Sequence, residues 1–229
     1  MADGLLVIDK PQGITSHDVV SRARKALKTK KVGHAGTLDP MATGVLILGV
    51  NKATRLLGQL ALTTKEYDAT IKFGETTTTE DAEGEITEIQ DASHLTKEDI
   101  EQAAKAFRGE IQQIPSSVSA IKVDGKRAYQ RVRDGEEVKL KPRTVTISEL
   151  TIKDFRANAS SEENESTGTV EVDVHVACSS GTYIRALARD LGAALGTGAH
   201  LTMLRRTKVG PFDITEASAE PDEASIIGM

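Results

Sequence analysis

Apolar and polar residues alternate with a period of two, as in half-buried β-strands, in two parts of the chain. In residues 67–73 every second position is apolar, and residues 170–176 carry a valine at every second position. Short apolar runs at 5–8 and 45–50, bounded by polar or glycine residues, are typical of buried strands. A further strand is predicted over 144–152, so much of the chain is expected to form sheet.

A spacing of three or four residues predicts three helices. The first begins at Ser16, which we expect to be its N-cap. The second follows a capping box formed by Thr96 and Asp99, and the third covers 183–195 and ends at Gly196. Because helices and strands do not alternate regularly, a doubly wound parallel sheet is not indicated, and the pattern predicts an α+β fold.

Length and composition limit the class of protein. A chain of 229 residues suits one large domain or two small ones. The longest apolar run is too short to span a bilayer, and the N-terminus lacks the pattern of a signal peptide, which predicts a cytoplasmic protein. Cys178 is the only cysteine, so an internal disulfide is excluded and a thiolate metal cluster is disfavoured.

Charge is unevenly distributed along the chain, although 29 basic and 34 acidic residues give a net charge of only −5. Residues 22–31 hold six basic residues and no acidic one, and residues 122–143 hold eight basic and four acidic residues. Acidic residues gather in 75–101 and are expected to form a solubilising surface. Each basic run taken alone is typical of a solvated face, whereas together they fit a surface that contacts phosphates.

The segment with the strongest chemical signal is GHAGTLDPMATG, at residues 33–44. It places Asp39 directly before Pro40, which restricts the backbone of both residues and holds the carboxylate in a fixed direction. Taken alone, an Asp–Pro pair in a glycine-containing loop also fits an Asx-turn, in which the carboxylate serves only the local backbone.

This segment is one of five ordered blocks through which the chain resembles the TruB family of tRNA pseudouridine synthases. The blocks are GLLVIDKPQGITSHDVV at 4–20, KKVGHAGTLDPMATGVLILGVNKATRLL at 30–57, KEYDATIKFGETTTTEDAEGE at 65–85, SAIKVDGKRAYQRVRDGEEV at 119–138 and VACSSGTYIRALARDLGAALGTGAHLTMLRRTKVGPF at 176–212. The resemblance implies the pseudouridine-synthase fold, a mixed and largely antiparallel sheet flanked by helices.

The resemblance also implies a domain organisation. Residues 1–212 would form the catalytic domain, with a thumb inserted at about 122–143 that closes over RNA. Residues 213–229 would be a C-terminal tail, and the small C-terminal RNA-binding domain usual in relatives would be absent. Residues 157–168 read as an exposed polar loop. Ser116 and Val118 replace a proline and an aromatic residue that many relatives carry before the thumb.

The implied reaction isomerises uridine to pseudouridine, which oxidises nothing and loses no group, so we expect neither a cofactor nor a metal. It requires a nucleophile, a base that removes a proton and a pocket for an extruded base. By resemblance, Asp39 is the nucleophile, Arg185 is the cation that pairs with it, and Tyr67 stacks on the target base and takes part in proton removal. Taken alone, Tyr67 is typical of a core position and Arg185 of a helix surface, although its apolar neighbours indicate that it points inward.

Five further residues match substrate-binding positions of the family. His34 corresponds to a histidine that stacks within the RNA, and Tyr183 corresponds to a pocket residue. Lys10 and Leu204 match positions that line the pocket. Lys65 either supports the strand of Tyr67 or contacts a phosphate.

The preferred hypothesis is a tRNA pseudouridine synthase that flips and isomerises the T-loop uridine, position 55 in tRNA numbering. Its partner would be the T-arm stem-loop of tRNA, with no membrane, no obligate protein partner and a monomeric state. Two alternatives stay open at this point. One is a non-catalytic protein that binds or folds tRNA with the same basic face, and the other is a synthase that acts on another RNA.

Overall fold

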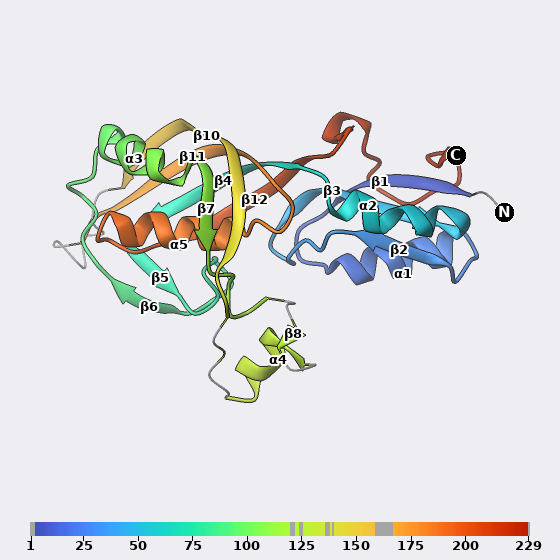
Figure 1. Ribbon diagram of the computed structural model, residues 1–229, viewed down its shortest axis with the longest axis horizontal. Helices are drawn as coiled ribbons and strands as arrows, with labels where there is room; N and C mark the ends of the chain where they lie inside the picture. Colours follow the sequence, from blue (N-terminus) through green and yellow to red (C-terminus); the bar gives the residue numbers. More distant parts are fainter. Residues whose placement is uncertain are drawn as a thin grey trace. The chain divides into compact units, whose positions relative to one another are not determined.

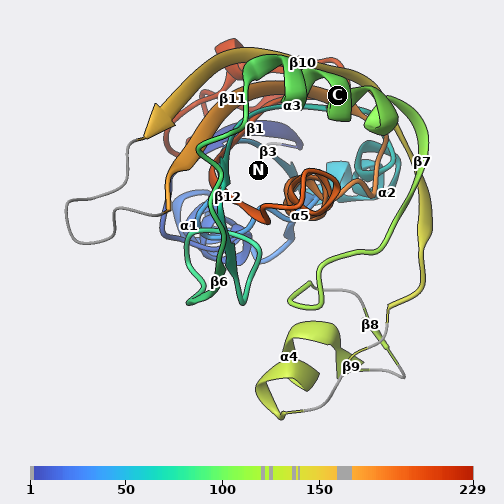
Figure 2. The ribbon, with the colours of Figure 1, turned by 90° about the vertical axis from the view of Figure 1, so that its left-hand side faces the viewer.

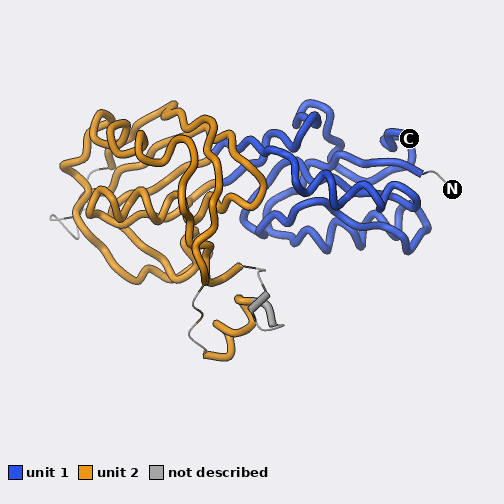
Figure 3. The backbone as a smooth tube through the Cα atoms, viewed as in Figure 1, with its two compact units in different colours: residues 1–68, 204–229 blue, residues 69–203 orange. Residues whose placement is uncertain are grey.

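The computed structural model (Figure 1) describes residues 3–119, 122–123, 126–135, 138, 140–158 and 167–228. The chain forms two compact units: unit 1 comprises Met1–Asp68 and Leu204–Met229, and unit 2 comprises Ala69–Met203 (Figure 3). Strands β4 (Lys65–Phe73) and β12 (Ala199–Val209) contribute residues to both units. The predicted α+β class is confirmed, whereas most of the predicted polar loop and parts of the predicted thumb lie outside the described residues.

Unit 1 is built on a sheet with the order β14-β1-β3-β12, in which β2 also pairs with β3 and β13 with β12. Strand β12 pairs with β3 in parallel, whereas β1 with β14, β1 with β3, β2 with β3 and β12 with β13 are antiparallel. Its other elements are β1 (Gly4–Lys10), α1 (Ser16–Ala26), β2 (Val32–Ala35), β3 (Thr43–Val50), η1 (Asn51–Leu56), α2 (Leu57–Ala61), β13 (Phe212–Asp213), η3 (Ile214–Glu216) and β14 (Ile227–Gly228).

The core of unit 1 has two layers because successive residues of β1 and β3 point to opposite faces of the sheet. On one face the strands pack against α1, which buries Val19, Val20 and Ala23. On the other face they pack against η1, α2 and the segment after β12, including Phe212 and Ile214. The C-terminal segment 213–228 is therefore part of unit 1.

Unit 2 continues with the strand order β12-β4-β11-β10-β7. Its other elements are β5 (Glu75–Thr77), β6 (Ile86–Ile89), α3 (Lys97–Ala104), η2 (Lys105–Phe107), β7 (Gly109–Gln113), β8 (Lys122–Val123), β9 (Lys126–Arg127), α4 (Ala128–Arg133), β10 (Arg143–Asn158), β11 (Thr169–Cys178) and α5 (Ile184–Ala194). Figure 2 shows β10 and β11 arching around α5, whose first two turns are largely buried.

The five predicted strands and three predicted helices are all present. The four valines of β11 are buried, and the capping box of Thr96 and Asp99 is confirmed. The predicted N-cap of α1 is wrong: Thr15 caps this helix in a capping box with Asp18. Strand β12 was not predicted from the sequence. None of the helices in the described ranges is long and apolar enough to cross a membrane.

Candidate active site

Asp39 lies half-buried in the loop between β2 and β3, and this loop is held on both sides of the carboxylate. Before it, the Ser16 hydroxyl accepts a hydrogen bond from the Leu38 N–H at 2.9 Å and donates to the Leu38 carbonyl at 3.2 Å. After it, the Pro40 carbonyl accepts from the N–H of Gly13 at 2.7 Å. Ser16 therefore serves the Asp39 loop in place of its predicted role at the helix end.

Lys10 lies beneath the same loop, with its side chain fully buried. Its ammonium donates to the carbonyls of Pro11 at 2.9 Å, Ile14 at 2.7 Å and Pro40 at 3.4 Å. Lys10 was predicted to line a substrate pocket. These bonds give Lys10 a part in holding the backbone next to Asp39, because a buried ammonium must be bonded to be tolerated, and its place in the pocket lining stays a prediction.

Arg206 also holds this loop, and sequence reasoning missed it. Its side chain is 2% exposed, and the guanidinium donates to the carbonyls of Gly36 at 3.0 Å and Val45 at 2.8 Å, which bracket the loop. The adjoining Gly44 is required because a Cβ there would collide with the Arg206 carbonyl, and its φ is +105°. Consecutive arginines in a basic stretch suggest solvent exposure, so the sequence offered no signal for this burial.

His34 lies on β2, two residues before the Asp39 loop begins at Gly36. Burial lowers the pKa of its imidazole, and the positive charge of Arg206 lowers that pKa further. Its buried Nδ1 has no hydrogen-bond partner among the described residues. The ring is therefore neutral at neutral pH, which suits stacking on a nucleobase better than pairing with a phosphate.

We expect His34 to make the protein less stable in mild acid. Its folded pKa lies below the ordinary value of 6.5, so below that pH the unfolded chain binds more protons and the free energy of unfolding falls. Thermal unfolding from about pH 7.5 to about pH 5.5 should show a smaller decrease in Tm for His34→Gln than for the wild type. The exposed His94 provides the control: His94→Gln should keep the wild-type dependence. Equal pH dependence in all three proteins would contradict this assignment.

Tyr67 is 7% exposed on β4, and Leu204 is equally buried on β12. Lys65, two residues before Tyr67, donates from its ammonium to the carbonyls of Ala61 and Thr63, each at 2.6 Å. Of the two roles considered for Lys65, this geometry favours support of the Tyr67 strand, because the ammonium is bonded to backbone carbonyls at the end of α2 and just after it.

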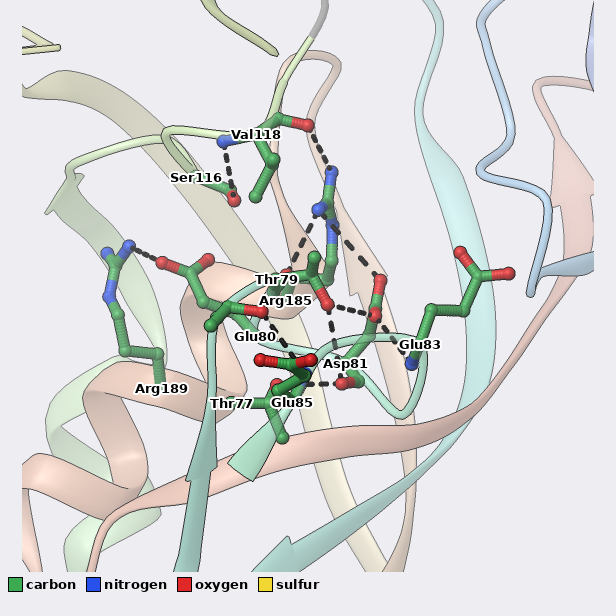
Figure 4. Close-up of polar contacts among 11 residues, drawn as sticks. Thr77, Thr79, Glu80, Asp81, Glu83, Glu85, Ser116, Val118, Arg185 and Arg189 are labelled. Atoms are coloured by element: carbon green, nitrogen blue, oxygen red, sulfur yellow. Dashed lines mark hydrogen bonds and ion pairs between the residues drawn. The ribbon is translucent and has the colours of Figure 1, made fainter. Parts of the chain in front are cut away.

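Arg185 stands in the first turn of α5 in unit 2 and is 6% exposed, so the expectation that it points inward is confirmed. Its guanidinium donates to the Thr79 carbonyl at 3.1 Å and to the Val118 carbonyl at 3.5 Å, and lies 3.9 Å from the carboxylate of Asp81 (Figure 4). The predicted pairing with Asp39, a residue of unit 1, stays a prediction.

Asp81 is a second residue that sequence reasoning missed. It is 2% exposed, and its Oδ1 accepts hydrogen bonds from the Thr79 hydroxyl at 2.6 Å and the Glu83 N–H at 3.0 Å. The expectation that the acidic residues of 75–101 form a solvated surface is therefore wrong for Asp81. A carboxylate fixed in this way can hold the charge and direction of a buried arginine.

Tyr183, the residue before α5, is positioned through its backbone. The Gln113 side-chain amide accepts from the Tyr183 N–H at 2.8 Å and donates to the Tyr183 carbonyl at 3.1 Å. Gln113 is 1% exposed at the end of β7. This paired contact fixes the start of the helix that carries Arg185.

The basic run 22–31 occupies the end of α1 and the turn after it. The guanidinium of Arg24 donates a hydrogen bond to the Val32 carbonyl at 2.9 Å, so this side chain packs against β2. The other basic residues of the run are exposed; they are Arg22, Lys25, Lys28, Lys30 and Lys31. They form a cationic surface on unit 1 that a phosphate backbone could contact. Across the ranges that the structure describes, no three His, Cys, Asp or Glu side chains gather in a way that could hold a metal ion.

Two protein-family models match the chain. The model for the TruB family pseudouridylate synthase N-terminal domain matches residues 24–184. The model for the tRNA pseudouridylate synthase B C-terminal domain matches residues 185–220. Together the two matches cover most of the chain, including Asp39, Tyr67 and Arg185.

Individual relatives are similar over nearly the whole chain. Proteins named tRNA pseudouridine synthase B from Mycobacteroides abscessus and Rhodococcus jostii are 58% and 60% identical over 93% of the chain, covering 70% and 68% of the relatives. A structure described as an H/ACA RNP bound to a substrate RNA containing 2′-deoxyuridine superposes with a TM-score of 0.65 at 30% identity over 94% of the chain. The chain spans half the length of that protein. The chain belongs to the TruB family of pseudouridylate synthases.

Proposed function

We propose that this chain, a tRNA pseudouridine synthase by family, isomerises the T-loop uridine at position 55 with Asp39 as its nucleophile. The observation that carries the proposal is the fixation of the Asp39 loop, which buried Ser16, Lys10 and Arg206 hold by its backbone. A carboxylate presented in this way is ordered before substrate arrives, which lowers the cost of reaching the transition state.

In the proposed reaction the bond from uracil N1 to the sugar C1′ breaks, the base rotates, and a bond from C5 to C1′ forms. The C5 proton leaves, and N1 takes up a proton. Asp39 supplies the electron pair at the sugar–base junction, and Arg185 keeps that carboxylate ionised. Tyr67 stacks on the extruded base and takes part in removal of the C5 proton. Because every atom other than the exchanged proton is retained, the product has the mass of the substrate.

Substrate binding in this proposal combines charge and stacking. The exposed cations of residues 22–31 contact phosphates of the T-arm, and the neutral ring of His34 stacks where flipped bases leave a gap. Tyr183 and Leu204 line the pocket for the base. The protein acts as a monomer on tRNA in the cytoplasm.

The loss of the C5 proton gives a direct test of this function. With tRNA transcripts that carry tritium at uridine C5, the protein should release tritium into water, and a transcript with cytidine at the T-loop position should release none. A non-catalytic tRNA-binding protein would bind both transcripts and release no tritium from either. A synthase for another RNA would release none from tRNA but would act on other uridine-labelled RNA.

Tyr67→Phe should bind tRNA with wild-type affinity and yet release tritium at least about 100-fold more slowly. The phenyl ring preserves stacking and burial on β4, whereas the hydroxyl needed for proton removal is lost. A filter-binding Kd and a single-turnover rate constant separate these two effects. A wild-type rate for Tyr67→Phe would reduce Tyr67 to a stacking residue.

A further inference from the structure

Glu80 has an unusual backbone for its residue type. Its φ is +64°, in the left-handed region that residues other than glycine, asparagine and aspartate seldom adopt. It stands between Thr79, whose carbonyl accepts a hydrogen bond from Arg185, and Asp81, whose carboxylate lies 3.9 Å from the same guanidinium. A strained residue persists only where its surroundings fix it.

Three contacts fix Glu80. Its N–H donates to the Thr77 carbonyl at 3.3 Å, and its carbonyl accepts from the Leu201 N–H at 3.1 Å. Its carboxylate Oε1 accepts from the guanidinium of Arg189 at 2.8 Å, as Figure 4 shows. The other carboxylate oxygen is buried and has no partner among the described residues. One oxygen of the Glu80 carboxylate therefore pairs with Arg189, while the other is removed from water without a hydrogen bond from the described residues. Burying that second oxygen costs desolvation free energy.

Arg189 lies one helical turn after Arg185 on α5, so the two side chains share a face of the helix. Besides Glu80, it donates to the Ile114 carbonyl at 2.7 Å and to the Asp190 carboxylate at 3.0 Å. Although burial disfavours its charge, the hydrogen bond to Asp190 and the charge of Glu80 raise the pKa of Arg189. Arg185 therefore binds the turn at the Thr79 carbonyl, and Arg189 binds it at the carboxylate of the next residue, Glu80.

We propose that the Glu80–Arg189 ion pair is a positioning pair, which holds the turn 77–81 so that the Thr79 carbonyl and the Asp81 carboxylate orient Arg185. This inference rests on the proposed function, because it concerns the residue that keeps Asp39 ionised. Neither Glu80 nor Arg189 touches the reacting atoms. Their effect on the reaction passes through the direction of the Arg185 guanidinium.

A matched ion pair in the same unit separates positioning from simple stability. Lys72 and Glu75 are 2.9 Å apart, and the Glu75 side chain is 15% exposed, as is that of Glu80. Glu75→Gln therefore removes a pair of nearly the same length and burial. Glu80→Gly provides a second variant of Glu80, because glycine accepts the positive φ and the variant should fold readily.

The experiment measures single-turnover tritium release, tRNA affinity and Tm for the full chain. Glu80→Gln and Glu80→Gly should each lower the rate constant about ten-fold, with the Kd within two-fold of wild type, whereas Glu75→Gln should leave the rate unchanged. In an Asp81→Asn background, Glu80→Gln should cause a further loss well below ten-fold, because part of its effect passes through Asp81 and the rest through the Thr79 carbonyl.

Several results would overturn the proposal. These are a wild-type rate in Glu80→Gln and Glu80→Gly, an equal loss in Glu75→Gln, or a full ten-fold additional loss in the Asp81→Asn background. A wild-type protein that binds tRNA and releases no tritium would instead overturn the proposed function, and the positioning role with it. An active wild type with active Glu80 variants would overturn the positioning role alone.

Discussion

Replacing Asp39 with asparagine is expected to abolish isomerisation, lowering the single-turnover rate by about four orders of magnitude or more. Asparagine has nearly the shape of aspartate, but its amide neither attacks a sugar–base junction nor carries a charge that pairs with an arginine. The loop itself should persist in the variant, because Ser16, Lys10 and Arg206 hold it through backbone atoms. Affinity for tRNA should therefore stay within a few-fold of wild type.

Single-turnover tritium release and filter binding, measured on the same preparations, test this expectation. Asp213→Asn is a suitable control, because Asp213 is an acidic residue of the same unit that caps η3, and asparagine caps equally well. The control should release tritium at the wild-type rate. Residual turnover near wild type in Asp39→Asn would remove Asp39 from the mechanism and return it to the role of a turn residue.

Asp81→Asn should have the second largest effect, with turnover lowered about 100-fold and the free energy of unfolding lowered by about 1–3 kcal/mol. Arg185 and Asp81 are 6% and 2% exposed, so removing one charge leaves the other buried without its partner. Asparagine can still accept the hydrogen bonds from Thr79 and Glu83 with its one oxygen, but its amide nitrogen, a donor, then takes the place of the oxygen that faces Arg185. The guanidinium of Arg185 is then less precisely directed. The rate should therefore fall more than the loss of folded protein alone would cause.

Denaturant unfolding and single-turnover rates on Asp81→Asn test both parts. Asp173→Asn provides the matched control within unit 2, because Asp173 pairs with Arg156 at 2.8 Å, but its side chain is 36% exposed. Asp173 accepts hydrogen bonds from Arg156 and Thr70 and is more exposed than Asp81, so Asp173→Asn should lower stability less than Asp81→Asn and leave the rate unchanged. If Asp81→Asn behaved like Asp173→Asn, the buried arginine would not depend on this carboxylate.

The sequence predicted those elements whose burial follows from a local pattern. The alternating valines of β11 and the capping box before α3 depend only on neighbours in the chain, and both are confirmed. Strand β12 escaped prediction because it buries His200 and Arg206 at positions where a strand pattern would show apolar residues. Those polar side chains are satisfied by carbonyls from distant segments, which no local pattern reveals.

The same distinction applies to the candidate site. The 33–44 motif drew attention to Asp39 because its glycines and proline are unusual in themselves, and the apolar neighbours of Arg185 indicated burial. Asp81 was hidden because it stands in an acidic run that appears solvated. Its burial arises from packing of the turn 77–81 against α5, more than 100 residues later in the chain.

The most direct test of the central claim is primer extension on a T-arm stem-loop transcript after carbodiimide treatment, with the wild type and Asp39→Ala. Carbodiimide leaves a stable adduct on pseudouridine that stops the polymerase, and it locates a product that has the mass of the substrate. A stop at the T-loop uridine with the wild type and none with Asp39→Ala is the predicted result. Equal stops with both proteins, or none with either despite measurable binding, would contradict the account.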